Sequence, residues 1–169
     1  MKLTSHTCDR LRSLLRLKEV HRTGWTRFEI PRERVESVAD HSYGVALLAW
    51  FLCPPELDST KVLEMALIHD LAEVVTGDIT PSQGVPREVK TQAELSALAE
   101  LTHGLERAER ALVILREYQN QESHEARFLK MVDKLEMALQ SLAYEDDFSI
   151  DLTEFRSFFE ASGNTPEES

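Results

Sequence analysis

The chain has 169 residues, a formal net charge of −11 at pH 7, 42% hydrophobic residues and 29% charged residues. That length suits one domain, and the six glycines and six prolines fall mostly between periodic segments, which favours an all-α fold. The acidic balance argues against a nucleic-acid polymer as partner, because phosphate contacts need a basic face. The two distant cysteines make no disulfide framework, and we see neither a signal peptide nor an apolar run of membrane-spanning length. We therefore expect a cytoplasmic protein with no membrane partner.

Apolar residues at helical spacing predict a bundle of about six to seven helices. Pro54 and Pro55 end the second helix, Asp58 or Ser59 caps the third, and Gly77 stops it. We predict a single domain over residues 1–162 and a flexible polar tail over 163–169. The expected helices cover residues 5–20, 36–52, 59–76, 87–102, 105–118 and 123–144, and a last short helix is capped by Asp151 and carries Leu152, Phe155, Phe158 and Phe159.

One histidine falls on the apolar face of its predicted helix. His41 comes three residues after Val38 and four before Val45, so the helical period points it inward. A single inward histidine is more often a hydrogen-bonded core residue than a metal ligand. The position of His41 alone leaves both interpretations open.

The stretch 65–78, MALIHDLAEVVTGD, places further polar residues on a buried face. Asp70 lies among apolar residues such as Leu67 and Val74, so its carboxylate is expected to face inward. Asp133 borders the apolar stripe of the 123–144 helix in the same way. Burying an unpaired carboxylate costs several kcal/mol, and the two aspartates have few obvious Arg or Lys partners on their own faces. They need a compensating positive charge.

A divalent cation would compensate both carboxylates. His41, His69, Asp70 and Asp133 form a mixed nitrogen and oxygen set that suits Co²⁺, Mn²⁺, Fe²⁺ or Zn²⁺. Such an ion lowers the pKa of water and polarises a phosphoryl oxygen. The His-Asp dipeptide is a weak motif by itself, because neighbouring helical residues point about 100° apart. The combination of inward residues is what indicates a metal site for phosphate-ester hydrolysis.

The H…HD…D arrangement of His41, His69-Asp70 and Asp133 resembles the HD-domain metal-dependent phosphohydrolases, which are helical bundles. The flanking segments narrow the resemblance to the 5′-deoxynucleotidase branch of that family. They occur in the family's order and span nearly the whole chain. They read HRTGW (21–25), RVESVADHSYGVA (34–46), ALIHDLAEVVTGDITP (66–81), VPREVK (85–90) and EARFLKMVDKLEMALQSLAYE (125–145).

The resemblance implies a role for each of these residues. One divalent ion per site (Co, Mn, Fe, Zn or Mg) would be held by His41, His69, Asp70 and Asp133. Glu73 and Asp78 match the family's catalytic carboxylates, near the water and the leaving oxygen. Glu73 follows His69 by four residues and shares its helical face, which agrees with such a role. From the residues alone, Glu73 is also readable as a surface charge and Asp78 as a turn residue after Gly77.

The substrate side follows the family less closely. Trp25 matches the family's tryptophan near the sugar, where a bulky ring disfavours a ribose 2′-hydroxyl, although it is also readable as an apolar anchor for its loop. The family carries an arginine directly before this tryptophan, and Gly24 stands there instead. The cations that remain to bind phosphate are Arg22 first and Arg27 second, with Arg87 and Lys90 matching a basic pair after the GDITP loop.

The expected function is metal-dependent hydrolysis of deoxyribonucleoside 5′-monophosphates, and the resemblance implies a homodimer. Two alternatives stay open. The first alternative is a different HD phosphohydrolase, acting on a nucleoside triphosphate, a cyclic nucleotide or an alarmone. The second is a non-catalytic nucleotide-binding module whose metal only stabilises the helical core. Glu73 and Asp78 discriminate between the classes, because a purely structural metal needs neither.

Overall fold

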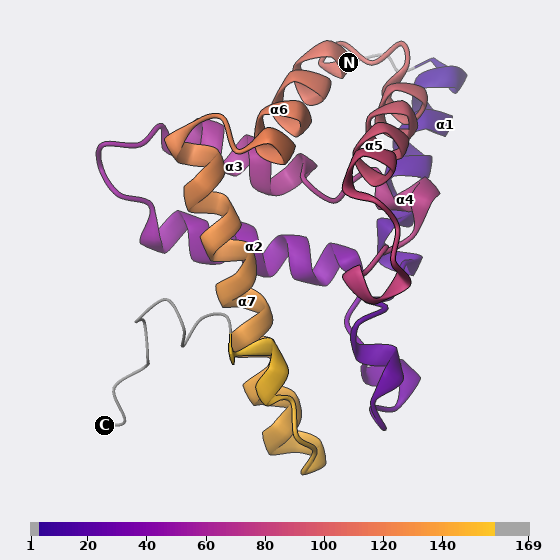
Figure 1. The fold of residues 1–169 in the computed structure, drawn as a ribbon. Helices are drawn as coiled ribbons and strands as arrows, with labels where there is room; N and C mark the ends of the chain where they lie inside the picture. The colour runs from indigo at the N-terminus through magenta and orange to yellow at the C-terminus, as the bar shows by residue number, and fades with distance from the viewer. Residues whose placement is uncertain (1–3, 158–169) are drawn as a thin grey trace.

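Two helices that cross near their middles, α2 (Val38–Leu52) and α7 (His124–Phe148), form the centre of the computed structural model (Figure 1). Helix α3 (Ser59–Ile68) packs against both of them. The core between the three helices consists of fully buried apolar side chains such as Val45 and Leu129. The site described below lies along this crossing, so the most tightly packed part of the fold positions it.

The structure describes residues 4–157, and within this range the only regular elements are helices. The all-α prediction is confirmed. No helix in the described range is both long and apolar enough to cross a bilayer. The remaining α-helices are α1 (Ser5–Leu14), α4 (Glu73–Thr76), α5 (Arg87–Thr102) and α6 (Ala108–Asn120), and the 3-10 helices are η1 (Leu15–Glu19), η2 (Trp25–Arg27), η3 (Arg32–Arg34), η4 (Pro81–Gln83) and η5 (Thr153–Phe155).

Side-chain caps set the start of the three central helices. Ser37 accepts a hydrogen bond from the backbone N–H of Asp40, whose carboxylate accepts one from the N–H of Ser37 in return. Asp58 caps α3 and Ser123 caps α7. A cap of this kind stabilises a helix by about 1 kcal/mol. These caps agree with the helix starts that the sequence predicts to within about two residues.

The predicted third helix is not continuous. Its α-helical part ends at Ile68, and α4 begins only at Glu73. In between, backbone bonds of the i→i−3 type, from Leu71 to Ile68 (3.1 Å) and from Glu73 to Asp70 (3.0 Å), replace the α-helical pattern. Three residues per turn instead of 3.6 change which side chains point inward. Leu67, which the helical period predicts to be buried, lies in α3 before this break and is 66% exposed, so that prediction is wrong.

Other predicted boundaries also change. The first helix ends as an α-helix at Leu14 and continues as 3-10 helix η1, short of the predicted end at residue 20. Gly77 does stop α4, with φ of +71°, a conformation that glycine adopts without a steric cost. Phe158, Phe159 and the predicted polar tail lie outside the described residues, so the domain limits stay a prediction.

Candidate metal centre and active site

A cavity of about 570 Å³ opens between the chain after η1, the α3–α4 turn, the loop before α5 and the face of α7. Eight of the eleven residues predicted for the site line it: Arg22, Trp25, Arg27, Asp70, Glu73, Asp78, Lys90 and Asp133. His41 and His69 do not reach the cavity surface, and they are 0% and 3% exposed. Arg87 is not among the lining residues.

Four predicted ligands converge beside this cavity. His41 Nε2 lies 3.3 Å from Asp133 Oδ1 and 3.7 Å from Asp70 Oδ2, and His69 Nε2 lies 3.3 Å from the same Asp70 oxygen. Both Nε2 atoms are buried and have no hydrogen-bond partner. Buried polar atoms are normally paired, so these two nitrogens need an explanation. His41, His69 and Asp70 form one of the groups that could hold a metal ion within the described residues.

The other ring nitrogens are already engaged. His41 Nδ1 lies 2.5 Å from Glu136 Oε2, and His69 Nδ1 lies 2.9 Å from the carbonyl oxygen of Ala66. A carbonyl only accepts, so His69 carries its hydrogen on Nδ1 and presents a lone pair at Nε2 when neutral. This is how metal-binding imidazoles are oriented, with the second nitrogen donating to a carboxylate or carbonyl. The donor set therefore fits a divalent ion.

The site holds an excess of negative charge. Burial and Arg22 lower the pKa of His41, but the neighbouring carboxylates of Asp133, Glu136 and Asp70 outweigh them and raise it to about 10. Burial would raise the pKa of Asp70, yet His69, His41 and Arg22 hold it well below its usual range. The ionised carboxylates make the site electrically negative, and this is why the imidazole of His41 favours its protonated form. A bound cation would neutralise the same negative charge.

Asp133 is held by a second set of contacts. Its Oδ2 accepts hydrogen bonds from the Tyr118 hydroxyl (2.8 Å) and from Lys130 Nζ (2.7 Å), which leaves Oδ1 facing His41. The sequence suggested few obvious Arg or Lys partners for Asp133 on its own face, but Lys130, three residues before it, pairs with it at 2.7 Å. Burial opposes ionisation, but Lys130 and His41 keep the pKa of Asp133 well below its usual range.

Glu73 is a buried acid. It is 2% exposed, so its interpretation as a surface charge is wrong, and its Oε2 has no hydrogen-bond partner. Burial, together with the neighbouring Asp70 and Asp78, raises the pKa of Glu73 to about 10. A cation beside it would lower that value, since an opposite charge favours the carboxylate.

Asp78 also faces the cavity and is 8% exposed. Its Oδ2 accepts a short hydrogen bond from the backbone N–H of Thr23 (2.6 Å), and Oδ1 lies 3.6 Å from Arg22 Nη1. These contacts tie the loop after α4 to the segment after η1. Asp78 is therefore a fixed wall of the cavity as well as a residue of the turn after Gly77.

Arg22 lies deepest of the predicted phosphate-binding cations. Its Nη1 atom is 3.8 Å from Asp70 and 3.6 Å from Asp78, and Nε is 4.0 Å from Glu36. All three distances exceed that of a normal hydrogen bond, so these carboxylates do not engage the guanidinium N–H groups in hydrogen bonds. The guanidinium thus faces the cavity with unused donor capacity.

Trp25 is 1% exposed, yet it is one of the cavity-lining residues. Its Nε1 donates to Glu36 Oε1 (2.6 Å), and its ring packs edge-on against Tyr144 and tilted against Phe155. The residue therefore anchors its loop beside the cavity, and its role near the sugar stays a prediction.

The other predicted cations lie further out. Arg27 pairs with Glu154 (2.9 Å), and Lys90 donates to the carbonyl of Ile79 (2.7 Å), so both line the cavity while holding neighbouring segments. Arg87 instead donates to the carbonyl of Gln119 (2.7 Å). The structure does not bring Arg87 to the cavity.

Four charged residues near the site escaped sequence reasoning: Glu36, Lys130, Lys134 and Glu136. Lys130 and Lys134 line the cavity, and Glu36 and Glu136 form with His41 a second buried group of possible metal ligands. Three of the four lie within three residues of Asp133 on α7, so helical spacing around that aspartate was the available signal. Glu36 had no such signal, since its partners come from other segments.

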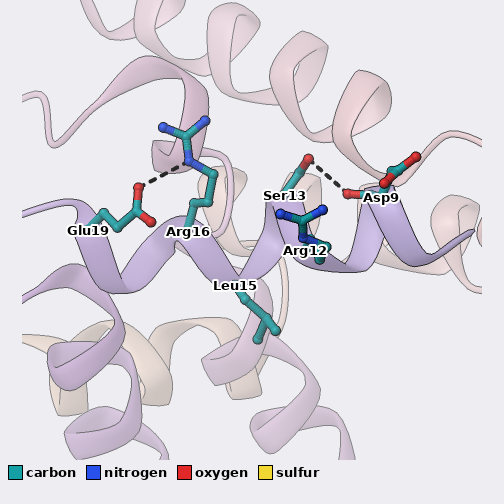
Figure 2. Close-up of a pocket in the computed structure, with 6 residues that line it drawn as sticks. All are labelled: Asp9, Arg12, Ser13, Leu15, Arg16 and Glu19. Carbon is teal, nitrogen blue, oxygen red and sulfur yellow. Dashed lines mark hydrogen bonds and ion pairs between the residues drawn. The ribbon is translucent and has the colours of Figure 1, made fainter. Parts of the chain in front are cut away.

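A second hollow of similar size runs along α1 and η1 (Figure 2). Figure 2 shows Ser13 donating to the backbone of Asp9 (3.0 Å) and Arg16 paired with Glu19 (3.1 Å). None of its six lining residues is buried. It is a solvated helix surface and shows none of the unmet polar atoms of the first cavity.

The comparisons with known proteins agree with the resemblance seen in the sequence. Residues 14–168 match the HD domain family, and the chain belongs to that family. A bovine protein named 5′-deoxynucleotidase HDDC2 is 41% identical over 138 residues, covering 80% of this chain and 66% of that protein. The 5′-deoxynucleotidase hdd1 of Schizosaccharomyces pombe is 37% identical over 150 residues, covering 84% of this chain and 75% of its own length. The chain thus spans about two thirds to three quarters of these relatives.

A solved structure shows the same fold. A protein from Pyrococcus horikoshii superposes with a TM-score of 0.77 at 31% identity, covering 93% of this chain and 89% of its own. The all-helical fold is therefore that of the HD domain proteins.

Proposed function

We propose that the chain is a metal-dependent phosphomonoesterase that hydrolyses deoxyribonucleoside 5′-monophosphates to deoxynucleoside and phosphate. The pair of buried imidazole Nε2 atoms without partners, beside Asp70 and Asp133, carries the proposal. The relatives named 5′-deoxynucleotidase support the substrate class.

The proposed cofactor is one divalent ion per site, Co, Mn, Fe, Zn or Mg, held by His41, His69, Asp70 and Asp133. Two imidazoles and two carboxylates are a donor set that such ions accept. When bound, the ion polarises a phosphoryl oxygen and lowers the pKa of water. The four side chains come from α2, the end of α3 and α7, so the helix crossing fixes their spacing.

The protein residues bind the phosphate and move the protons. Arg22 faces the cavity with donors to spare and suits a two-pronged contact with a phosphate. Glu73 accepts a proton from the attacking water as its oxygen bonds to phosphorus. Asp78 supplies a proton to the 5′-oxygen as the bond between that oxygen and phosphorus breaks. Phosphate and a neutral nucleoside are released, and charge and atoms balance over a full cycle when Glu73 returns its proton to solvent and Asp78 takes one up.

The proposed binding residues for the rest of the nucleotide are Trp25, Arg27, Lys90 and Arg87. The Trp25 ring, held by Glu36, Tyr144 and Phe155, is rigid enough to reject a ribose 2′-hydroxyl by crowding. Arg27 and Lys90 line the cavity and suit the outer part of a substrate. Arg87 rests on the resemblance alone, since it donates to the carbonyl of Gln119 and does not line the cavity.

Phosphate release tests this function. Metal-free protein is supplied with single divalent ions and with deoxyribonucleoside or ribonucleoside 5′-monophosphates. We expect release that depends on the ion, prefers the deoxy substrates and is lost in His69→Ala. No release with any ion, or unchanged release in His69→Ala, contradicts the enzyme function and leaves the non-catalytic module.

We also propose that the protein is a homodimer. Helix α2 presents an exposed apolar stripe at i, i+4, i+7 and i+8 spacing: Tyr43, Leu47, Trp50 and Phe51. Trp50 is 65% and Phe51 77% exposed, and contiguous exposed apolar surface marks interfaces. Light scattering on wild type and Trp50→Glu decides: a monomeric wild type contradicts the proposal. The cytoplasmic location stays a prediction.

A further inference from the structure

We propose that Glu136 is a positioning residue that holds His41 as a metal ligand, and that Gly44 exists in α2 to make room for it. The inference rests on the metal site of the proposed function. It assigns a role to a buried carboxylate that touches neither the cavity nor the proposed substrate.

The contact itself is short and buried. His41 is 0% and Glu136 8% exposed, and Nδ1 lies 2.5 Å from Oε2. A carboxylate only accepts when ionised, so this bond places the ring hydrogen on Nδ1 and turns Nε2 toward Asp133 and Asp70. Glu136 thereby selects the tautomer and the ring orientation that a metal ligand needs.

Helix α7 contacts both sides of the same imidazole. Asp133 faces Nε2 and Glu136, three residues further along, faces Nδ1. Residues three apart lie on one face of a helix, so a single turn of α7 holds the ring from two directions. His69 lacks such a grip, because its Nδ1 meets only the neutral carbonyl of Ala66. A charged acceptor makes the stronger bond and the more basic ligand.

Gly44 supports this reading from the opposite helix. It lies inside α2, where glycine costs roughly 0.5–1 kcal/mol relative to alanine. A Cβ at Gly44 would lie 2.6 Å from Oε1, 3.0 Å from Cγ and 3.2 Å from Cδ of Glu136. All three atoms belong to one side chain, so any larger residue would displace the carboxylate from His41. Glycine is unfavourable inside a helix, and the space that the Glu136 side chain needs explains why it stands at this position.

Glu36 completes the buried group, with possible ligand atoms of Glu36, His41 and Glu136 within 4.8 Å of one another. A cation among them is not favoured. Two ligands about 2.0–2.1 Å from a tetrahedral ion lie roughly 3.3 Å apart, whereas Nδ1 and Oε2 are 2.5 Å apart. A hydrogen fits between these atoms and an ion does not. The group therefore serves His41 and is not a second metal site.

The affinity for Co²⁺ alone tests the inference, measured by competition with a chelator on the full chain. Glu136→Ala is expected to weaken Co²⁺ binding about 10- to 100-fold. Glu136→Gln keeps an acceptor of the same size without the charge, so its affinity should fall between those of wild type and Glu136→Ala. The matched control is Glu125→Gln, on the same helix but paired with Lys61, and it should bind Co²⁺ as wild type does.

Gly44→Ala supplies an independent arm. It should weaken Co²⁺ binding in the wild-type background and have little further effect in Glu136→Ala, because the two changes act on one contact. Wild-type affinity in Glu136→Gln and Gly44→Ala, or in Glu136→Ala, overturns the inference. A wild-type chain that binds no Co²⁺ contradicts the proposed function instead, so the two failures are distinguishable.

Discussion

Two clusters of charge lie at opposite ends of α3, and they differ in whether the chain's own residues balance their charge. In the first, Lys61 on α3 lies 2.5 Å from Glu117 Oε1 on α6 and 3.3 Å from Glu125 Oε2 on α7. The hydrogen bond from Lys61 overcomes burial and lowers the pKa of Glu117, and backbone and Lys61 contacts lower that of Glu125. Both carboxylates are stabilised in the charged form by a cation that the chain itself provides.

The second cluster is the proposed metal centre, and it is not closed. The Nε2 atoms of His41 and His69 and one oxygen of Glu73 are buried without hydrogen bonds. Burial and its acidic neighbours raise the pKa of Glu73 to about 10, the opposite direction from Glu117. The comparison teaches that charge alone does not identify a site. The two clusters differ in what lies beside their unpaired buried atoms. Glu117 Oε1 also makes no hydrogen bond of normal geometry, but the cation Lys61 Nζ lies 2.5 Å from it. The neighbours of the two imidazole nitrogens are carboxylates, so a ligand has to meet their demand.

Removing a reacting group from the open cluster should have the largest effect. Asp78→Asn keeps the size of the side chain and its contact with the Thr23 N–H but cannot supply a proton. General acid catalysis is worth about 10²- to 10⁴-fold, so kcat should fall by that factor while Co²⁺ affinity stays near wild type. Steady-state phosphate release and chelator competition measure the two quantities. A near-normal kcat in Asp78→Asn would show that Asp78 is not the proton donor to the leaving oxygen.

Glu73→Gln should separate activity from stability. The change lowers kcat, since an amide cannot accept the proton from water. It also removes a buried carboxyl group, one oxygen of which lacks a hydrogen-bond partner. The free energy of unfolding of the metal-free variant should therefore equal that of wild type or exceed it by up to about 1 kcal/mol. Urea unfolding of metal-free protein checks this. A large loss of stability would mean that Glu73 is a structural residue.

The closed cluster should show the smallest effect and the opposite pattern. Lys61→Met should lower the free energy of unfolding by no more than about 1 kcal/mol, because the pair is partly exposed, and should leave phosphate release unchanged. Lys18→Met, at an exposed lysine of η1, is the matched control.

The sign of the pH dependence follows from the lowered pKa values of Glu117 and Glu125. Their contribution to stability is present above the ordinary value of 4.5 and is lost as the pH falls below it toward the folded-state values. Urea midpoints between about pH 3 and 6 should therefore fall less steeply in Lys61→Met than in wild type. Equal slopes would show that Lys61 does not hold these carboxylates.

Much of the fold could be predicted from the helical spacing of apolar residues and from the residues that cap or end helices. The start of α3 came from its capping residue Asp58 or Ser59, and the starts of α2 and α7 came from the spacing of their apolar residues. The inward position of His41 came from its apolar neighbours in the same way. Such signals are local, so one sequence contains them.

The rest depended on contacts between distant segments. The break after Ile68 replaces helical bonds by tighter ones, and no residue there is a proline or glycine that would announce it. Arg22 meets Asp78 because the chain after η1 packs beside the loop after α4. Trp25 meets Glu36 because the chain between η1 and α2 turns back on itself, where His21 pairs with Ser37. Glu136 was within reach of reasoning, since it follows Asp133 by three residues, but its partner His41 lies on another helix.

Equilibrium binding of a divalent ion to the metal-free chain tests the central claim most directly. Titration of Co²⁺ into wild type should saturate at one ion per chain, and His69→Ala, with one of the two unmet nitrogens removed, should lose that binding while keeping its helical circular dichroism. Absence of saturable binding in wild type, or the same binding in a folded His69→Ala, would contradict the account.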